Sequence, residues 1–179
     1  MNATRHVALV RGINVGRAKR VAMADLRRMV EGLGYRDVRT LLNSGNVVFS
    51  ASAAAGIKAA GRIEKAMAEE LGVSARVTVI TADELSEIVE DNPLADTASN
   101  HSRLLVAVFA DPADRARLAT LGKQDWAPGV LALGKRVAYL WCPEGMLENR
   151  LAIAIGRALG DRVTMRNWAT ISKLHTLLD

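Results

Sequence analysis

Residues 38–50 read VRTLLNSGNVVFS, and this stretch decides the fold of the chain. It holds two apolar runs separated by Asn43, Ser44 and Gly45, which are residue types that favour tight turns. Runs of this length that flank such a turn are typical of two antiparallel strands. The stretch therefore predicts a β-hairpin.

The segment before the hairpin predicts a strand and a helix. HVALV, His6–Val10, is a short apolar run that stops at Arg11, as a buried strand would. Apolar residues then recur at the i, i+3, i+4 and i+7 positions from Leu26 to Leu33, with Gly34 after the last of them. This spacing predicts an amphipathic helix that ends at the glycine.

The segment after the hairpin completes a βαββαβ unit. Ile63, Met67 and Leu71 share one face of a second predicted helix, and ARVTVI, residues 75–80, predicts the last strand. A short helix with Thr81 as its N-cap should follow.

The second half of the chain repeats this order. Its predicted elements are the strand RLLVAVFA, a helix from Asp111 to Leu121, the strands GVLAL and RVAYLW, a helix with an apolar stripe from Leu147 to Leu159, the strand RVTMR, and a closing helix with Thr170 as N-cap and with Ile171, Leu174 and Leu178 inward. The polar segment DNPLADTASNHS separates the halves. We therefore predict an α+β protein of two tandem ferredoxin-like halves, residues 1–92 and 93–179, each with a short helix after its last strand.

This topology predicts that two polar motifs meet. Right-handed crossovers place the first strand beside the third, antiparallel to it. The loop RGINVG, which leaves the first strand, and the turn NSGN, which enters the third, should therefore be neighbours.

Three motifs resemble the bacterial DUF1697 family, whose biochemical function is not established. They are ALVRGINVG, VAMADLRRMVEGLGYRDVRTLLNSGNVVF and TMRNWATISKLHTLL. The resemblance spans nearly the whole chain and implies two ferredoxin-like halves. The chain departs from the family pattern at Leu41, where an aromatic residue is usual, and at residues 147–151, where the usual serine and lysine are missing.

The first loop is a candidate anion site. Glycine permits close approach of the backbone to a ligand, and amides at a helix start favour phosphate. Basic side chains nearby would add charge, but the loop matches neither a dinucleotide fingerprint nor a P-loop. The alternative is that these residues only shape the turns. The candidate ligand-binding residues at the two strand ends are Arg11, Gly12, Asn14, Gly16, Lys19, Asn43, Ser44 and Asn46.

A third polar motif follows the last predicted strand. Arg166, Asn167 and Lys173 could complete a pocket with the first loop if the halves face each other. The alternative is that Trp168 packs in the core and Asn167 bonds to the backbone of its turn.

No catalytic residue, metal site or cofactor is predicted. The three histidines do not form a pair at helical spacing, and Cys142, the single cysteine, is expected to be buried or at a strand edge. One cysteine and the lack of an apolar leader or spanning segment favour a cytoplasmic protein with no membrane partner.

The function remains open between three alternatives. A net charge of +5 favours an acidic partner. We expect a small anionic or phosphorylated ligand at the strand-end loops. A nucleic-acid-binding module ranks lower because only 4% of residues are aromatic, and base stacking needs aromatics on the central strands. A scaffold without catalysis is the third alternative, and neither the oligomeric state nor enzymatic activity can be derived from the sequence.

Overall fold

The computed structural model describes residues 3–178, which form two compact units. One unit contains residues 3–84 and 176–178, and the other contains Leu85–His175. Within the described residues, no helix combines the length and the apolar character needed to cross a membrane. The predicted boundary near residue 92 remains a prediction.

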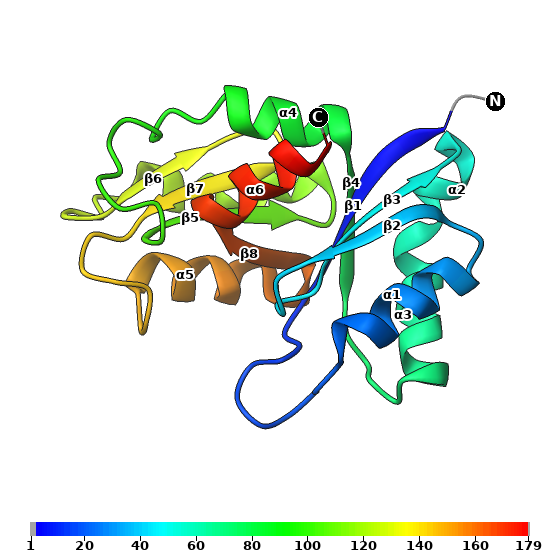
Figure 1. The fold of residues 1–179 in the computed structure, drawn as a ribbon. Helices are drawn as coiled ribbons and strands as arrows, with labels where there is room; N and C mark the ends of the chain where they lie inside the picture. The colour runs from blue at the N-terminus through cyan, green and yellow to red at the C-terminus, as the bar shows by residue number, and fades with distance from the viewer. Residues whose placement is uncertain (1–2, 179) are drawn as a thin grey trace. The chain divides into compact units, whose positions relative to one another are not determined.

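The first unit is a four-stranded antiparallel sheet in the order β2-β3-β1-β4. Helices α1 and α3 cover one of its faces (Figure 1). The elements of this half are β1 (Thr4–Val10), α1 (Met23–Gly32), β2 (Arg36–Leu41), β3 (Asn46–Ala51), α2 (Ala53–Ile57), α3 (Ala59–Glu70), β4 (Val77–Thr81) and α4 (Ala82–Glu90).

The second unit repeats the same strand order, β6-β7-β5-β8. Helix α5 packs on one face of this sheet, and α4 reaches the other face, where the Tyr139 hydroxyl donates to the Ile88 carbonyl at 2.7 Å. The elements are β5 (Leu104–Phe109), the 3-10 helices η1 (Pro112–Leu118) and η2 (Leu121–Lys123), β6 (Val130–Leu133), β7 (Val137–Trp141), α5 (Arg150–Leu159), the 3-10 helix η3 (Gly160–Arg162), β8 (Val163–Asn167) and α6 (Trp168–Leu178). The two tandem ferredoxin-like halves are confirmed.

Helix starts account for most differences from the sequence prediction. Thr81 caps α4 as predicted, with its hydroxyl accepting from the Glu84 amide at 3.1 Å. Helix α6 instead begins at Trp168, and the Asn167 side chain, not Thr170, caps it. Helix α5 begins only at Arg150, because Asn149 accepts from two amides of its first turn.

One residue of a predicted apolar stripe and the type of one predicted helix were wrong. Leu147 precedes the cap of α5 and is 96% exposed, so it is not part of the apolar stripe. The predicted helix after Asp111 is two 3-10 segments, and the first of them buries both Leu118 and a carboxylate, Asp114. Both Asp114 oxygens lie 3.0 Å from Arg162 Nε, which compensates the charge that burial would otherwise isolate.

His6 is built into the core of the first unit. It is buried in β1, its ring stacks on Phe49 with centroids 5.4 Å apart, and Nδ1 lies 2.9 Å from the Thr4 carbonyl oxygen. Gly56 in α2 packs directly against the imidazole. This arrangement leaves no room for a side chain at residue 56.

We expect Gly56→Ala to destabilise the protein by about 1–3 kcal/mol, as overpacking of a core does. A Cβ at residue 56 would lie 2.7 Å from His6 Cε1 and closer still to Nε2. Urea denaturation measures the change. Gly61→Ala in α3 is the matched control, since its Cβ would meet no atom within 4 Å and should leave stability equal or raise it by about 0.5–1 kcal/mol. Equal effects at both positions would contradict the close packing.

The stability of the protein should also fall in mild acid because of His6. Burial lowers the pKa of this histidine below 6.5, against smaller opposing effects of the Thr4 carbonyl and the Glu84 charge. The unfolded chain then binds the proton more readily, so this contribution is complete above pH 6.5 and is lost as the pH falls through the lowered pKa. One histidine contributes a slope of at most about 1.4 kcal/mol per pH unit. Urea midpoints between pH 7.5 and 5 should show a slope that His6→Gln reduces, and an unchanged slope would exclude His6 as its source.

Candidate functional site

The loop after β1 and the β2–β3 turn are neighbours, as the topology predicts. The Val10 amide donates to the Gly45 carbonyl at 2.8 Å, and the Arg11 amide donates to the Arg76 carbonyl at 2.8 Å. Gly45 has a φ of +84°, and a Cβ there would lie 2.7 Å from the Val10 Cβ. Glycine is therefore required where the turn passes over the end of β1.

Asn14 holds the first loop in shape. Its side chain donates to the carbonyls of Val21 and Asn43 at 2.8 and 2.7 Å, and its Oδ1 accepts from the Val21 amide at 2.8 Å. Its own amide donates to the Lys19 carbonyl at 3.0 Å. Asn14 also has a φ of +56°, which asparagine tolerates better than most residues. The bonds to Lys19 and Val21 close the loop on itself, and the bond to Asn43 ties it to the hairpin.

Asn46 performs a similar task inside the hairpin. Its side chain is fully buried and donates to the Leu41 carbonyl and to the Ser44 hydroxyl oxygen, both at 2.9 Å. The amides of Asn14 and Asn46 thus serve the loops themselves. The ligand-binding roles predicted for them remain predictions, and Asn43 and Ser44 are exposed beside them.

The charges of the loop point outward from this rigid base. Residues 11–20 contain four basic and no acidic side chains. All four are exposed, and Gly12 and Gly16 between them have φ values of +70° and +64°. The basic residues are Arg11, Arg17, Lys19 and Arg20. The structure therefore presents an exposed cationic loop that is anchored at Asn14.

The third predicted motif lies in the second unit. The Arg166 guanidinium is buried in β8 and donates to the Thr164 hydroxyl oxygen and the Met165 carbonyl, each at 2.9 Å. Burial lowers its pKa to about 10, so it stays charged at neutral pH. Asn167 caps α6, Trp168 is buried as the packing alternative predicted, and Lys173 is exposed. A pocket shared with the first loop remains a prediction.

The described part of the chain contains neither a metal-ligand cluster nor an activated cysteine. Residues 3–178 contain no group of three or more His, Cys, Asp or Glu side chains close enough to hold a metal ion. Cys142 is a free thiol, fully buried, and burial raises its pKa to about 11. A thiol with so high a pKa is a poor nucleophile at neutral pH.

A hollow of about 280 Å³ lies at the start of α5. Its wall includes Glu144, Gly145, residues 147–151 and Trp126. The Arg150 guanidinium lies 5.6 Å from the centre of the Trp126 ring. The sequence pattern did not reveal this hollow, because its wall is formed by loops without periodicity. Residues 147–151, where the chain departs from the family pattern, form part of it.

The strand order defines a protein of two tandem ferredoxin-like halves. The N-terminal half carries the loop RGINVG and the turn NSGN at one end of its sheet. The chain belongs to the family described as protein of unknown function (DUF1697), whose profile matches residues 3–139. A search of curated proteins finds no match. Among solved structures, the chain is similar to the conserved bacterial protein SP0830 from Streptococcus pneumoniae, with a TM-score of 0.80, 23% identity, and coverage of 99% of this chain and 100% of that one. That likeness supports the fold.

We expect Asn14→Ala to destabilise the protein by about 2–4 kcal/mol, because it removes three hydrogen bonds and places alanine at a positive φ. Urea denaturation and hydrogen exchange at the Val21 amide measure the two effects. Asn14→Gly is the matched control, since glycine accepts the backbone conformation but lacks the amide. If both variants keep the stability and the Val21 protection of the parent, Asn14 does not hold the loop.

Proposed function

We propose that the protein binds a small anionic or phosphorylated ligand at the loop of residues 11–20 beside the β2–β3 turn. The observation that carries the proposal is the set of four exposed basic side chains on a loop fixed by Asn14, with no acidic residue among them. A loop that is anchored by hydrogen bonds loses less conformational entropy when a ligand binds than an unanchored loop does. Backbone amides near Gly12 and Gly16 can add hydrogen bonds to an oxyanion.

The placement of aromatic residues supports a small ligand over a nucleic acid. Recognition of single-stranded RNA by a ferredoxin-like sheet needs exposed aromatics on the central strands. Phe49, on β3, is fully buried in the core under α1 and α3, and Tyr35 packs against it with ring centroids 4.7 Å apart. The buried free thiol of Cys142 supports a cytoplasmic location, which is part of this proposal.

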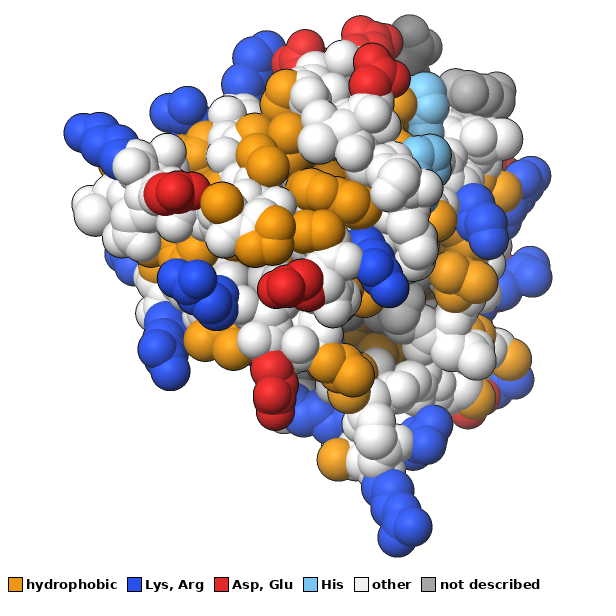
Figure 2. Space-filling view, turned by 90° about the vertical axis from the view of Figure 1, so that its left-hand side faces the viewer, with side chains coloured by type: hydrophobic (Ala, Val, Ile, Leu, Met, Phe, Trp, Pro, Cys, Tyr) orange, Lys and Arg blue, Asp and Glu red, His pale blue; other side chains and the backbone are white. Residues whose placement is uncertain are grey.

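A scaffold is the second candidate function. Large apolar side chains are exposed in the second unit at Val130, Met146, Leu147 and Ile153. Figure 2 shows apolar side chains gathered on the middle of the face that it presents, with Lys and Arg mainly around its edge. Exposed apolar side chains that gather in this way favour contact with another protein chain.

The loop proposal predicts that phosphate binding depends on the loop charges. A triple variant with Arg17→Gln, Lys19→Gln and Arg20→Gln should bind inorganic phosphate about tenfold or more weakly. The binding is measured from the amide chemical shifts of Gly12 and Gly16 during a phosphate titration. Stability should change little, because exposed charges contribute little to folding.

The matched control removes three positive charges elsewhere in the first unit. The control variant carries Arg28→Gln, Lys58→Gln and Lys65→Gln. These three residues are exposed and lie on or beside α1, α2 and α3. If this control weakens phosphate binding as much as the loop variant does, the attraction is a general effect of net charge and the loop is not the site.

A further inference from the structure

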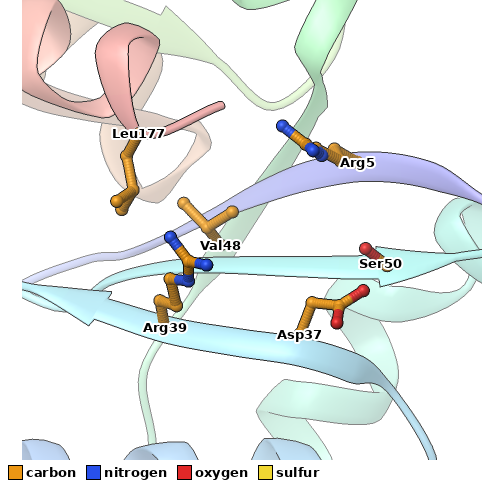
Figure 3. Close-up of a pocket in the computed structure, with 6 residues that line it drawn as sticks. All are labelled: Arg5, Asp37, Arg39, Val48, Ser50 and Leu177. Atoms are coloured by element: carbon orange, nitrogen blue, oxygen red, sulfur yellow. The ribbon is translucent and has the colours of Figure 1, made fainter. Parts of the chain in front are cut away.

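A pocket of about 370 Å³ opens on the first unit, on the sheet face opposite α1 and α3. Its floor is Val48 and Ser50 of β3, and Arg5, Asp37 and Arg39 form its charged walls, with Leu177 at one side (Figure 3). Its volume is within the usual range for a metabolite site. None of these residues belongs to the loop of residues 11–20.

The local backbone places the acidic group in the pocket. The register of the β2–β3 pair shifts between Arg36 and Arg39, and the extra residue, Asp37, has a φ of +53°. Bulges of this kind redirect side chains and occur often beside functional sites. A left-handed conformation at a residue other than glycine costs free energy, so the rest of the structure has to enforce it. Val38, next in the chain, is buried in the core and fixes the strand.

The polar groups of the pocket have unused bonding capacity. Ser50 is 8% exposed, and its hydroxyl lines the pocket. Among residues 3–178, the side chains of Ser50, Asp37 and Arg39 form no hydrogen bond or ion pair with the protein. The Ser50 hydroxyl opens into the pocket and can both donate and accept, so it is available to bond to a ligand there.

The two signs of charge occupy different parts of the pocket. Figure 3 shows the Asp37 carboxylate directed toward Ser50, whereas the Arg39 guanidinium extends over Val48 toward Leu177. Arg5 stands on the opposite wall and is held there because its Nη1 donates to the Leu178 carbonyl. A simple anion would meet the Asp37 carboxylate, and a simple cation would meet two guanidinium groups. A ligand with charge of one sign therefore leaves at least one charged group of the pocket without a complementary partner.

We propose that this pocket binds a small zwitterion. Its carboxylate or phosphate pairs with Arg39 and lies within the field of Arg5, and its ammonium pairs with Asp37. The Ser50 hydroxyl bonds to the ligand between these charges, and Val48 supports the carbon chain that joins them. The site is independent of the phosphate site proposed at residues 11–20.

Calorimetric titration with phosphoethanolamine and γ-aminobutyrate tests the proposal, with inorganic phosphate, butyrate and ethylamine as probes that carry one kind of charge. We expect at least one zwitterion to bind about tenfold or more tightly than either of its one-charge counterparts. Asp37→Asn and Arg39→Gln should each weaken that binding about tenfold or more. Asparagine also tolerates a positive φ, so Asp37→Asn should melt at the temperature of the parent protein.

Two sets of controls separate this site from others. Asp25→Asn and Arg28→Gln remove the same kinds of charge from α1 and should leave the affinity unchanged, as should the triple loop variant at residues 17, 19 and 20. Loss of zwitterion binding in any of these would overturn the proposal. If neither zwitterion binds, the proposal is also overturned. If Asp37→Asn strengthens phosphate binding at Arg39, the pocket is a plain anion pocket and the proposal is wrong.

Discussion

The burial of β1 on both of its faces is the constraint on which the first half depends. Val7, Ala8, Leu9 and Val10 are all fully buried, and the strand pairs with β3 on one side and β4 on the other. A strand in this position has to be apolar at consecutive residues rather than alternate ones. Polar side chains are therefore accommodated at the two ends of the strand, beyond the buried run. The cationic loop follows one end, and Arg5 precedes the buried run at the other.

Periodicity in the sequence was sufficient to predict strand order and the main helices, since apolar spacing reflects burial directly. It failed where a single polar contact decided the structure. Asn149 sets the start of α5 later than the apolar pattern suggests, and Asn167 sets the start of α6 earlier. Asp114 is buried because Arg162 pairs with it, and the two residues are far apart in the sequence. A partner that distant cannot be found from local spacing.

The candidate sites were predictable to different degrees. The meeting of the first loop with the hairpin follows from topology alone, so its residues could be named in advance. The role of Asn14 could not, because an amide that bonds to Val21 and Asn43 has the same sequence signature as one that binds a ligand. The pocket of Arg5, Asp37 and Arg39 was missed because its residues come from different strands. The one available signal was Ser50, a polar residue directly after the apolar run of residues 47–49 in β3.

The two halves use one scaffold, but the segment that follows the first strand is strongly basic only in the first half. In the first half the amides of Val10 and Arg11 donate to the Gly45 and Arg76 carbonyls, and in the second half those of Phe109 and Ala110 donate to the Arg136 and Arg162 carbonyls. Arg11 and Gly12 therefore correspond to Ala110 and Asp111. The Asp111 carboxylate caps η1, which places a negative charge where the first half has an open glycine. A carboxylate in this place would repel an anion, so the anion site proposed beside Gly12 depends on the loop sequence and not on the duplicated fold.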